Sequence, residues 1–307
     1  MSTLNTHKLR EALRAHSEIS DKKLRKHHPT AAHWFEKRGL KPGDIRHHAA
    51  KLASAGALAG AMLISNPLIT KVSSFGNENL AILPLDQLRN LFASNVKALL
   101  PSSVHPLTPE EEAALSKLID VFWGIHASAT LEGEHLNTTY GYIGAEQHLP
   151  RFPGDTIDQH DEYQGSGITP GKGAWGYFAN SKSELTEDLI QKEKYYVAVQ
   201  TLYLPDWQER LSHLREWYKY RKVLVVNPKN GKTIVATVAD AGPAQFTGKQ
   251  FGGSPEVMAY LQMHDGAQRG PVLLFFVDDK NTTIPLGPVE RNSASGGSLS
   301  ASGGRKD

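Results

Sequence analysis

The segment 221–243, RKVLVVNPKNGKTIVATVADAGP, constrains the fold more than any other part of the chain. β-Branched residues dominate two runs in it, and apolar residues recur there at the period of two that strands require. The intervening NPKNG, which begins at Asn227, supplies turn chemistry, because its proline fixes φ and its Asn-Gly pair suits positive φ. The segment therefore predicts a β-hairpin.

Asp240 stands where the second strand of this hairpin ends. The following Ala241, Gly242 and Pro243 stop ladder pairing and turn the chain, so we expect the carboxylate near a loop rim. Asp240 is our catalytic candidate. The alternative is that its side chain only caps the following turn through its own backbone.

The hairpin resembles the double-psi β-barrel of the expansin, barwin and rare lipoprotein A superfamily, in which an N-x-x-N-G-K turn leads into a strand ending V-x-D-x-G-P. Further segments resemble that superfamily in the same order: GAWGYF at 173–178, YYVAVQT at 195–201, the helix at 253–261 and the closing strand at 270–277. The resemblance covers residues 171–279. It implies a six-stranded double-psi barrel and an aspartate that faces a polysaccharide.

The chain also departs from this superfamily. It has no cysteine, whereas expansins and barwins carry disulfides here, and Trp175 stands where the expansin motif has a cysteine. Rare lipoprotein A proteins place a histidine shortly before the hairpin, and His213 lies close to that place. The resemblance therefore assigns catalysis to Asp240, with His213 assisting.

Cleavage of a glycosidic bond needs a proton donor for the leaving oxygen, which Asp240 could supply if its pKa is raised. Hydrolysis usually adds a second carboxylate. Asp206, Glu209 and Glu216 are available, although all three could be surface charges on a helix-like segment. A lytic transglycosylase needs only one acid, because a hydroxyl of the substrate attacks. Expansins loosen polysaccharide without hydrolysis.

Aromatic and amide side chains of the barrel region could bind sugar, although large aromatics at strand or helix spacing often belong to the core. The substrate-binding candidates are Trp175, Tyr177, Trp207, Trp217, Tyr220 and Asn227.

The segment 131–167 gathers histidines and acids that could form a zinc or calcium site. They are Glu132, Glu134, His135, Glu146, His148, Asp158, His160 and Asp161. None shows a compact motif such as H-E-x-x-H. They could instead be solvated loop residues or line a groove beside the barrel, so we predict no metal and no other cofactor.

The N-terminal part differs in character from the rest. Up to Lys51 there are 12 Lys and Arg against 5 Asp and Glu. The uncharged run 52–65 follows, and extended to 48–70 it predicts a transmembrane anchor or a signal segment after a cytoplasmic arm at 1–47. The alternative is a buried helix of a soluble protein.

Apolar spacing over 85–100 and the capped start Thr108-Pro109 predict two helices, so residues 71–131 form a helical stalk or subdomain against the barrel. The barrel domain with its N-terminal loop extension occupies 132–290. The Ser/Gly-rich residues 291–307 have nothing to bury and should be disordered. The predicted fold class is α+β.

These observations leave two main hypotheses. One is an exported cell-wall enzyme, most plausibly a peptidoglycan lytic transglycosylase or hydrolase, either anchored in the membrane or secreted. The other is a non-catalytic wall-binding or wall-loosening module. A scaffold for a protein partner is a third option. The net charge of +2 gives no reason to expect nucleic acid.

Overall fold

The structure is a computed structural model, and it describes residues 25–26, 80, 83–263, 269–291 and 299–300. The chain separates into a unit of residues 1–66 and a unit of residues 67–307, and the second contains almost all of the described residues. The predicted arm at 1–47 lies outside the described residues except for Arg25 and Lys26, and the predicted anchor at 48–70 lies wholly outside them. Among the described helices, none has the length and apolar character to cross a membrane.

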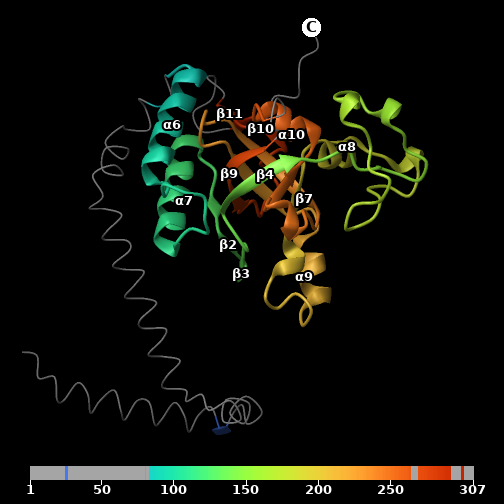
Figure 1. Cartoon of the computed structure of the whole chain (residues 1–307), viewed down its shortest axis with the longest axis horizontal. Coiled ribbons are helices and arrows are strands. Elements are labelled where there is room, and N and C mark those ends of the chain that lie inside the picture. Colours follow the sequence, from blue (N-terminus) through green and yellow to red (C-terminus); the bar gives the residue numbers. More distant parts are fainter. Residues whose placement is uncertain (1–24, 27–79, 81–82, 264–268, 292–298, 301–307) are drawn as a thin grey trace, which may run out of the picture. The chain divides into compact units, whose positions relative to one another are not determined.

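Six strands close into a mixed β-barrel (Figure 1). They are β4 (Tyr140–Ala145), β5 (Tyr196–Val199), β6 (Lys222–Val226), β7 (Thr233–Asp240), β8 (Phe251–Gly253) and β9 (Arg269–Val277). Around the barrel the order is β9, β4, β8, β5, β7 and β6, which returns to β9. The pairs β4–β8 and β5–β7 are parallel and the other four are antiparallel. The fold is therefore α+β, as predicted, with a closed six-stranded barrel.

The predicted hairpin is confirmed as β6 and β7, whose register pairs Val225 with Ile234. Strands β6, β7 and β9 are buried on both faces, which explains why they read as nearly continuous apolar runs. Alternate residues such as Val223 and Val225 fill the barrel interior. Their neighbours, such as Leu224, belong to a second core on the outer face.

Helices α6 (Leu85–Leu99) and α7 (Pro109–Trp123) cover that outer face, as Figure 1 shows. Helix α7 begins as predicted, because Thr108 and Glu111 form a reciprocal capping box and Pro109 occupies the first turn. Its buried Phe122 joins a core that also contains Phe275 of β9. The helical pair thus shares a core with the barrel.

The remaining elements are short. They are β1 (Ala127–Ser128), β2 (Thr130–Leu131), β3 (Glu134–His135), α8 (Glu187–Lys194), α9 (Leu211–Tyr218), α10 (Pro255–Tyr260), β10 (Gly287–Pro288), β11 (Glu290–Arg291) and β12 (Leu299–Ser300). Strand β12 pairs with β11 inside the segment predicted to be disordered. The first barrel strand, β4, lies inside the segment 131–167 and before residues 171–279, which the resemblance covers. We use the term loop extension for the segment between β4 and α8, which carries 3₁₀ turns at Ile157–Gln159, Gln164–Ser166 and Lys182–Glu184.

Candidate functional site

Asp240 lies at the end of β7 with a partly buried carboxylate. Its Oδ1 accepts hydrogen bonds from the backbone N–H of Ala174 at 3.0 Å and of Ala241 at 2.9 Å. Burial raises the pKa of this carboxyl above 3.8, its ordinary value, while the two backbone donors act in the opposite direction. The bond to Ala241 is the turn cap that we considered, and the bond to Ala174 adds a partner 66 residues away.

A row of small residues leads across the barrel wall to Asp240. Gly144 of β4 pairs with Gly252 of β8, Gly252 pairs with Ala198 of β5, and Ala198 pairs with Asp240. We call these four residues the small-residue row. The β5–β7 register shifts at Ala198, so a β-bulge lies beside the aspartate. The glycines and the alanine of this row are buried, and they leave room for neighbouring side chains to lie close to the backbone.

Two charged side chains lie over this row. A Cβ built on Gly252 would stand 2.3 Å from Oε1 of Glu146, and one built on Gly144 would stand 2.4 Å from the Lys249 side chain. Burial raises the pKa of Glu146, the charge of Asp240 adds to this, and Lys249 opposes it. Glu146 is thus a second carboxylate near Asp240. The sequence placed Glu146 among the eight candidates of the segment 131–167. Only the pairing of the strands shows that it lies near Asp240.

The loop after Asp240 forms a rim that carries one exposed aromatic side chain and contacts a second from the segment after β5. Gln200 donates from Nε2 to the carbonyl oxygens of Pro243 and Lys249, which fixes both ends of this loop. The backbone N–H of Gln245 donates to the hydroxyl of Tyr203. Phe246 follows with 93% of its surface exposed. Sequence reasoning missed Tyr203 and Phe246, whose only signals were that Phe246 follows the D-x-G-P turn and that Tyr203 follows the YYVAVQT segment.

His213 does not contact Asp240. Its Nε2 lies 3.0 Å from Oε1 of Glu134, which also binds Arg210. Arg210 and then His213 lower the pKa of Glu134 against the effect of burial. The helix α9 that carries His213 is linked to the site through Trp175, whose indole N–H donates to the Arg215 carbonyl at 2.7 Å.

Three of the predicted sugar-binding residues are buried. Trp207 is 5% exposed, and Trp217 is 9% exposed with its ring edge-on to Phe276 at 5.0 Å. Asn227 is 3% exposed, donates to the Leu261 carbonyl and accepts from the N–H of Lys229, so it shapes the hairpin turn. These placements explain the three residues by packing and turn formation.

The other two aromatic candidates lie nearer the surface. Tyr177 borders a pocket of about 360 Å³ at the base of the loop extension, with the ammonium of Lys172 5.0 Å from its ring. Tyr220 stacks on Phe178 at 5.6 Å. Neither forms a hydrogen bond to Asp240. Of the predicted second carboxylates, Asp206 pairs with Arg210, and Glu209 and Glu216 are exposed.

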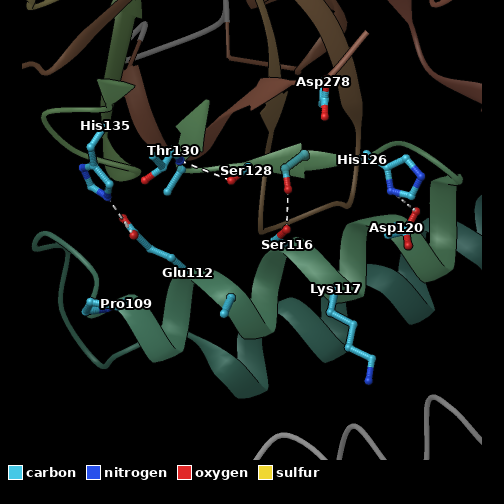
Figure 2. A pocket seen from close by; sticks show the side chains of 13 residues that line it. Pro109, Glu112, Ser116, Lys117, Asp120, His126, Ser128, Thr130, His135 and Asp278 are labelled. Atoms are coloured by element: carbon cyan, nitrogen blue, oxygen red, sulfur yellow. Dashed lines mark hydrogen bonds and ion pairs between the residues drawn. The ribbon is translucent and has the colours of Figure 1, made fainter. Parts of the chain in front are cut away.

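A larger open pocket of about 620 Å³ lies between α7 and β1–β2. Figure 2 shows that polar side chains around it already pair with one another. His135 lies 3.0 Å from Glu112, His126 lies 3.1 Å from Asp120, and Ser116 donates to the Ala127 carbonyl. This hollow contains no residue of the small-residue row, and we assign it no chemistry.

A second polar cluster lies buried behind the row, in the loop extension. It brings together His148, His160 and Glu193, the last of which belongs to α8. Burial raises the pKa of Tyr196 well above its usual range, and the charges of Glu146, Glu193, Asp240 and Glu256 add to this. The charges of this cluster and of Asp240 therefore both act on Tyr196.

Neither the family models nor the curated proteins with which the chain was compared contain a match to it. The site must therefore be judged by its geometry. A half-buried carboxyl with a raised pKa can donate a proton, and a second carboxylate close by can stabilise positive charge.

Proposed function

We propose that this chain is an exported cell-wall glycan-active enzyme, and specifically a peptidoglycan lytic transglycosylase with Asp240 as general acid. One observation carries the proposal: the carboxyl of Asp240 has a raised pKa and ends a row of small residues across the barrel wall. The raised pKa keeps the acid form present at a higher pH than an ordinary aspartate would allow.

The reaction needs one proton donor. Asp240 protonates the glycosidic oxygen as the bond from the anomeric carbon to that oxygen breaks. A hydroxyl of the same sugar then forms a bond to the anomeric carbon, and its proton returns to the Asp240 carboxylate. No water is consumed, which agrees with a site in which Asp240 has no second carboxylate in direct contact among the described residues.

Glu146 has a separate role in this proposal. The transition state of glycosidic cleavage carries positive charge on the sugar ring. The Glu146 carboxylate lies over Gly252, next to Ala198 in the row that ends at Asp240. In its charged form it stabilises the ring of a glycan bound at Asp240, and Lys249 favours that form.

The barrel itself supports the family resemblance without deciding it. We infer a double-psi barrel from the closed mixed sheet with two parallel pairs, together with the order of motifs over residues 171–279. The resemblance to the rare lipoprotein A and expansin superfamily points to a polysaccharide. The basic arm and the apolar run at 48–70 support placement of this domain outside the cell membrane.

The alternative function is a non-catalytic wall-binding or wall-loosening module. The exposed rim aromatics favour it, because Phe246 and Tyr203 offer faces on which sugars can stack. In that case Asp240 would accept or donate a hydrogen bond to a sugar hydroxyl without breaking a bond.

The test is mass spectrometry of purified peptidoglycan after incubation with the full-length chain or its Asp240→Asn variant. Anhydro-sugar products that vanish with the variant support the transglycosylase. New reducing ends would instead indicate a hydrolase. No products, together with co-sedimentation of the protein with the wall, would replace the enzyme by the binding module. No products and no binding would overturn both functions.

A further inference from the structure

The buried cluster in the loop extension has the composition of a metal site. His148 and His160 direct their Nδ1 atoms at the two carboxylate oxygens of Glu193, at 3.2 and 3.4 Å. All three side chains are at most 2% exposed. Two imidazoles and one carboxylate form a ligand set that zinc uses in proteins, and imidazole favours transition metals over calcium or magnesium.

The spacing of these atoms fits a tetrahedral ion. Zinc bonds of about 2.0–2.1 Å place neighbouring ligand atoms about 3.3–3.4 Å apart in a tetrahedron. The distance from Oε1 of Glu193 to His148 and the distance from Oε2 to His160 match that separation, and one ligand atom from each of the three residues lies within 4.8 Å of the others. Hydrogen bonds would give similar distances, so the argument needs the surroundings of the cluster.

The outer partner of His160 is that of a metal-bound histidine. Nε2 of His160 lies 3.1 Å from Oδ2 of Asp155, and Asp155 is held by the side chain and backbone N–H of Arg151. A carboxylate on the far nitrogen orients the ring, so that the other nitrogen can face an ion. The backbone N–H of Leu149 donates to Glu193 at 3.1 Å and fixes the third ligand in the same way.

The charges of the cluster do not balance without a cation. Arg151 compensates Asp155, but the partners of Glu193 are two histidines and a backbone N–H. A buried carboxylate is costly unless a positive charge accompanies it. That charge must be either a proton on an imidazole or a metal ion.

Two buried polar atoms at this place also lack a partner in the described part of the chain. They are Nε2 of His148, which is the ring nitrogen other than the one that faces Glu193, and Oε2 of Glu256, a residue of α10 whose pKa is influenced by the charges of His148 and Glu193. Unsatisfied buried groups commonly mark a bound ion or water. Glu256 does not belong to the group whose ligand atoms lie within 4.8 Å of one another, so it is our candidate for holding a water at the fourth position.

We propose that His148, His160 and Glu193 bind a divalent transition-metal ion of the zinc class. The ion connects the chain just after β4, the turn at Ile157–Gln159 and helix α8. It fixes the loop extension behind Tyr196 and Asp240. This site is independent of the glycan activity, since none of its ligands belongs to the small-residue row.

The experiment measures zinc in the full-length chain without a polyhistidine tag, after loading with ZnCl₂ and dialysis, by elemental mass spectrometry. Half of the 14 histidines lie before residue 52 and can bind metal weakly. The measurement is therefore a difference between wild type and the variants His160→Gln and Glu193→Gln. His105→Gln is the matched control, because this histidine is exposed and outside the cluster.

The expected result is that the wild type and His105→Gln retain one zinc per chain more than either cluster variant. Zinc should also raise the Tm of the wild type and leave that of the variants unchanged. Equal zinc content and equal Tm response in all four proteins would overturn the proposal and assign a proton-bearing histidine network to the cluster.

The cluster variants could fail to fold because the site is buried, and circular dichroism would reveal this. The proposal is then tested on the wild type alone, by the visible absorption of bound Co²⁺. Co²⁺ held by two imidazoles and carboxylate oxygens in a buried four-coordinate site gives intense visible absorption, whereas Co²⁺ on exposed histidines stays six-coordinate and pale. Absence of the intense band at one equivalent would overturn the proposal.

Discussion

Replacement of Asp240 separates its chemical role from its structural role, because two substitutions differ in what they leave behind. The Asn side chain keeps an oxygen at the place of Oδ1, so it can still accept from the N–H groups of Ala174 and Ala241. The Ala side chain removes the acceptor and leaves both N–H groups without their partner. Only the second change should affect folding strongly.

The magnitudes follow from these contacts. A buried donor left unpaired costs about 1–3 kcal/mol, so two of them should lower the free energy of unfolding of Asp240→Ala by about 2–6 kcal/mol. Asp240→Asn avoids this cost. It also removes a carboxyl whose raised pKa makes folding less favourable as pH rises above 3.8. At neutral pH the Asn variant should therefore be at least as stable as the wild type.

The assay is urea unfolding of the three full-length proteins at neutral pH and near pH 3, beside the peptidoglycan digestion. We expect the Asn variant to gain stability relative to the wild type only at the higher pH and to lose about 10²–10⁴-fold of any glycan activity. An Asn variant as unstable as the Ala variant would reduce Asp240 to a turn residue. Full activity in the Asn variant would refute its role as the acid.

Three further predictions concern the same face. Gly252→Val should displace the Glu146 carboxylate, because a Cβ at this position would stand 2.3 Å from its Oε1. Turnover should fall more than the free energy of unfolding, and kinetic and unfolding measurements on the same variant would test this. A pH–rate profile should fall as pH rises through the raised pKa of Asp240, since the acid form is the active one; a rate that rises there would contradict general-acid catalysis. Phe246→Ala should weaken wall binding about 2–10-fold in co-sedimentation and leave the free energy of unfolding unchanged, because its ring is exposed and can only act on a ligand. Unchanged binding would show that Phe246 is not part of the site.

The sequence predicted the elements whose signals are local. The hairpin at 221–243 combines strand periodicity with a turn that permits few conformations, and the structure contains it as β6 and β7. The start of α7 was equally clear, because Thr108, Pro109 and Glu111 act within one turn. Each of these signals concerns residues close together in the chain.

The surroundings of Asp240 could not be predicted in the same way. The small-residue row joins Gly144, Ala198, Asp240 and Gly252, which only the pairing of four strands brings together. Periodicity also does not tell which aromatic faces solvent, so buried Trp217 and exposed Phe246 could not be ranked from spacing.

The partnership of His148 and His160 with Glu193 was hidden for a further reason. Helix α8 has a strongly polar sequence, EDLIQKEK, which is typical of a solvated helix. Its one buried residue is the glutamate that faces the two histidines. A charged residue on such a helix carries no mark of burial in the sequence.

The shared core of α6, α7 and the outer barrel face has a practical consequence for protein engineering. A truncation that begins at the barrel's first strand, β4, would uncover apolar side chains of β6 and β9, including Leu224, Phe275 and Val277, over which the helices now pack. Exposed apolar surface of this kind causes aggregation. The smallest fragment worth expressing therefore begins before Leu80, whose side chain is only 1% exposed in the same core.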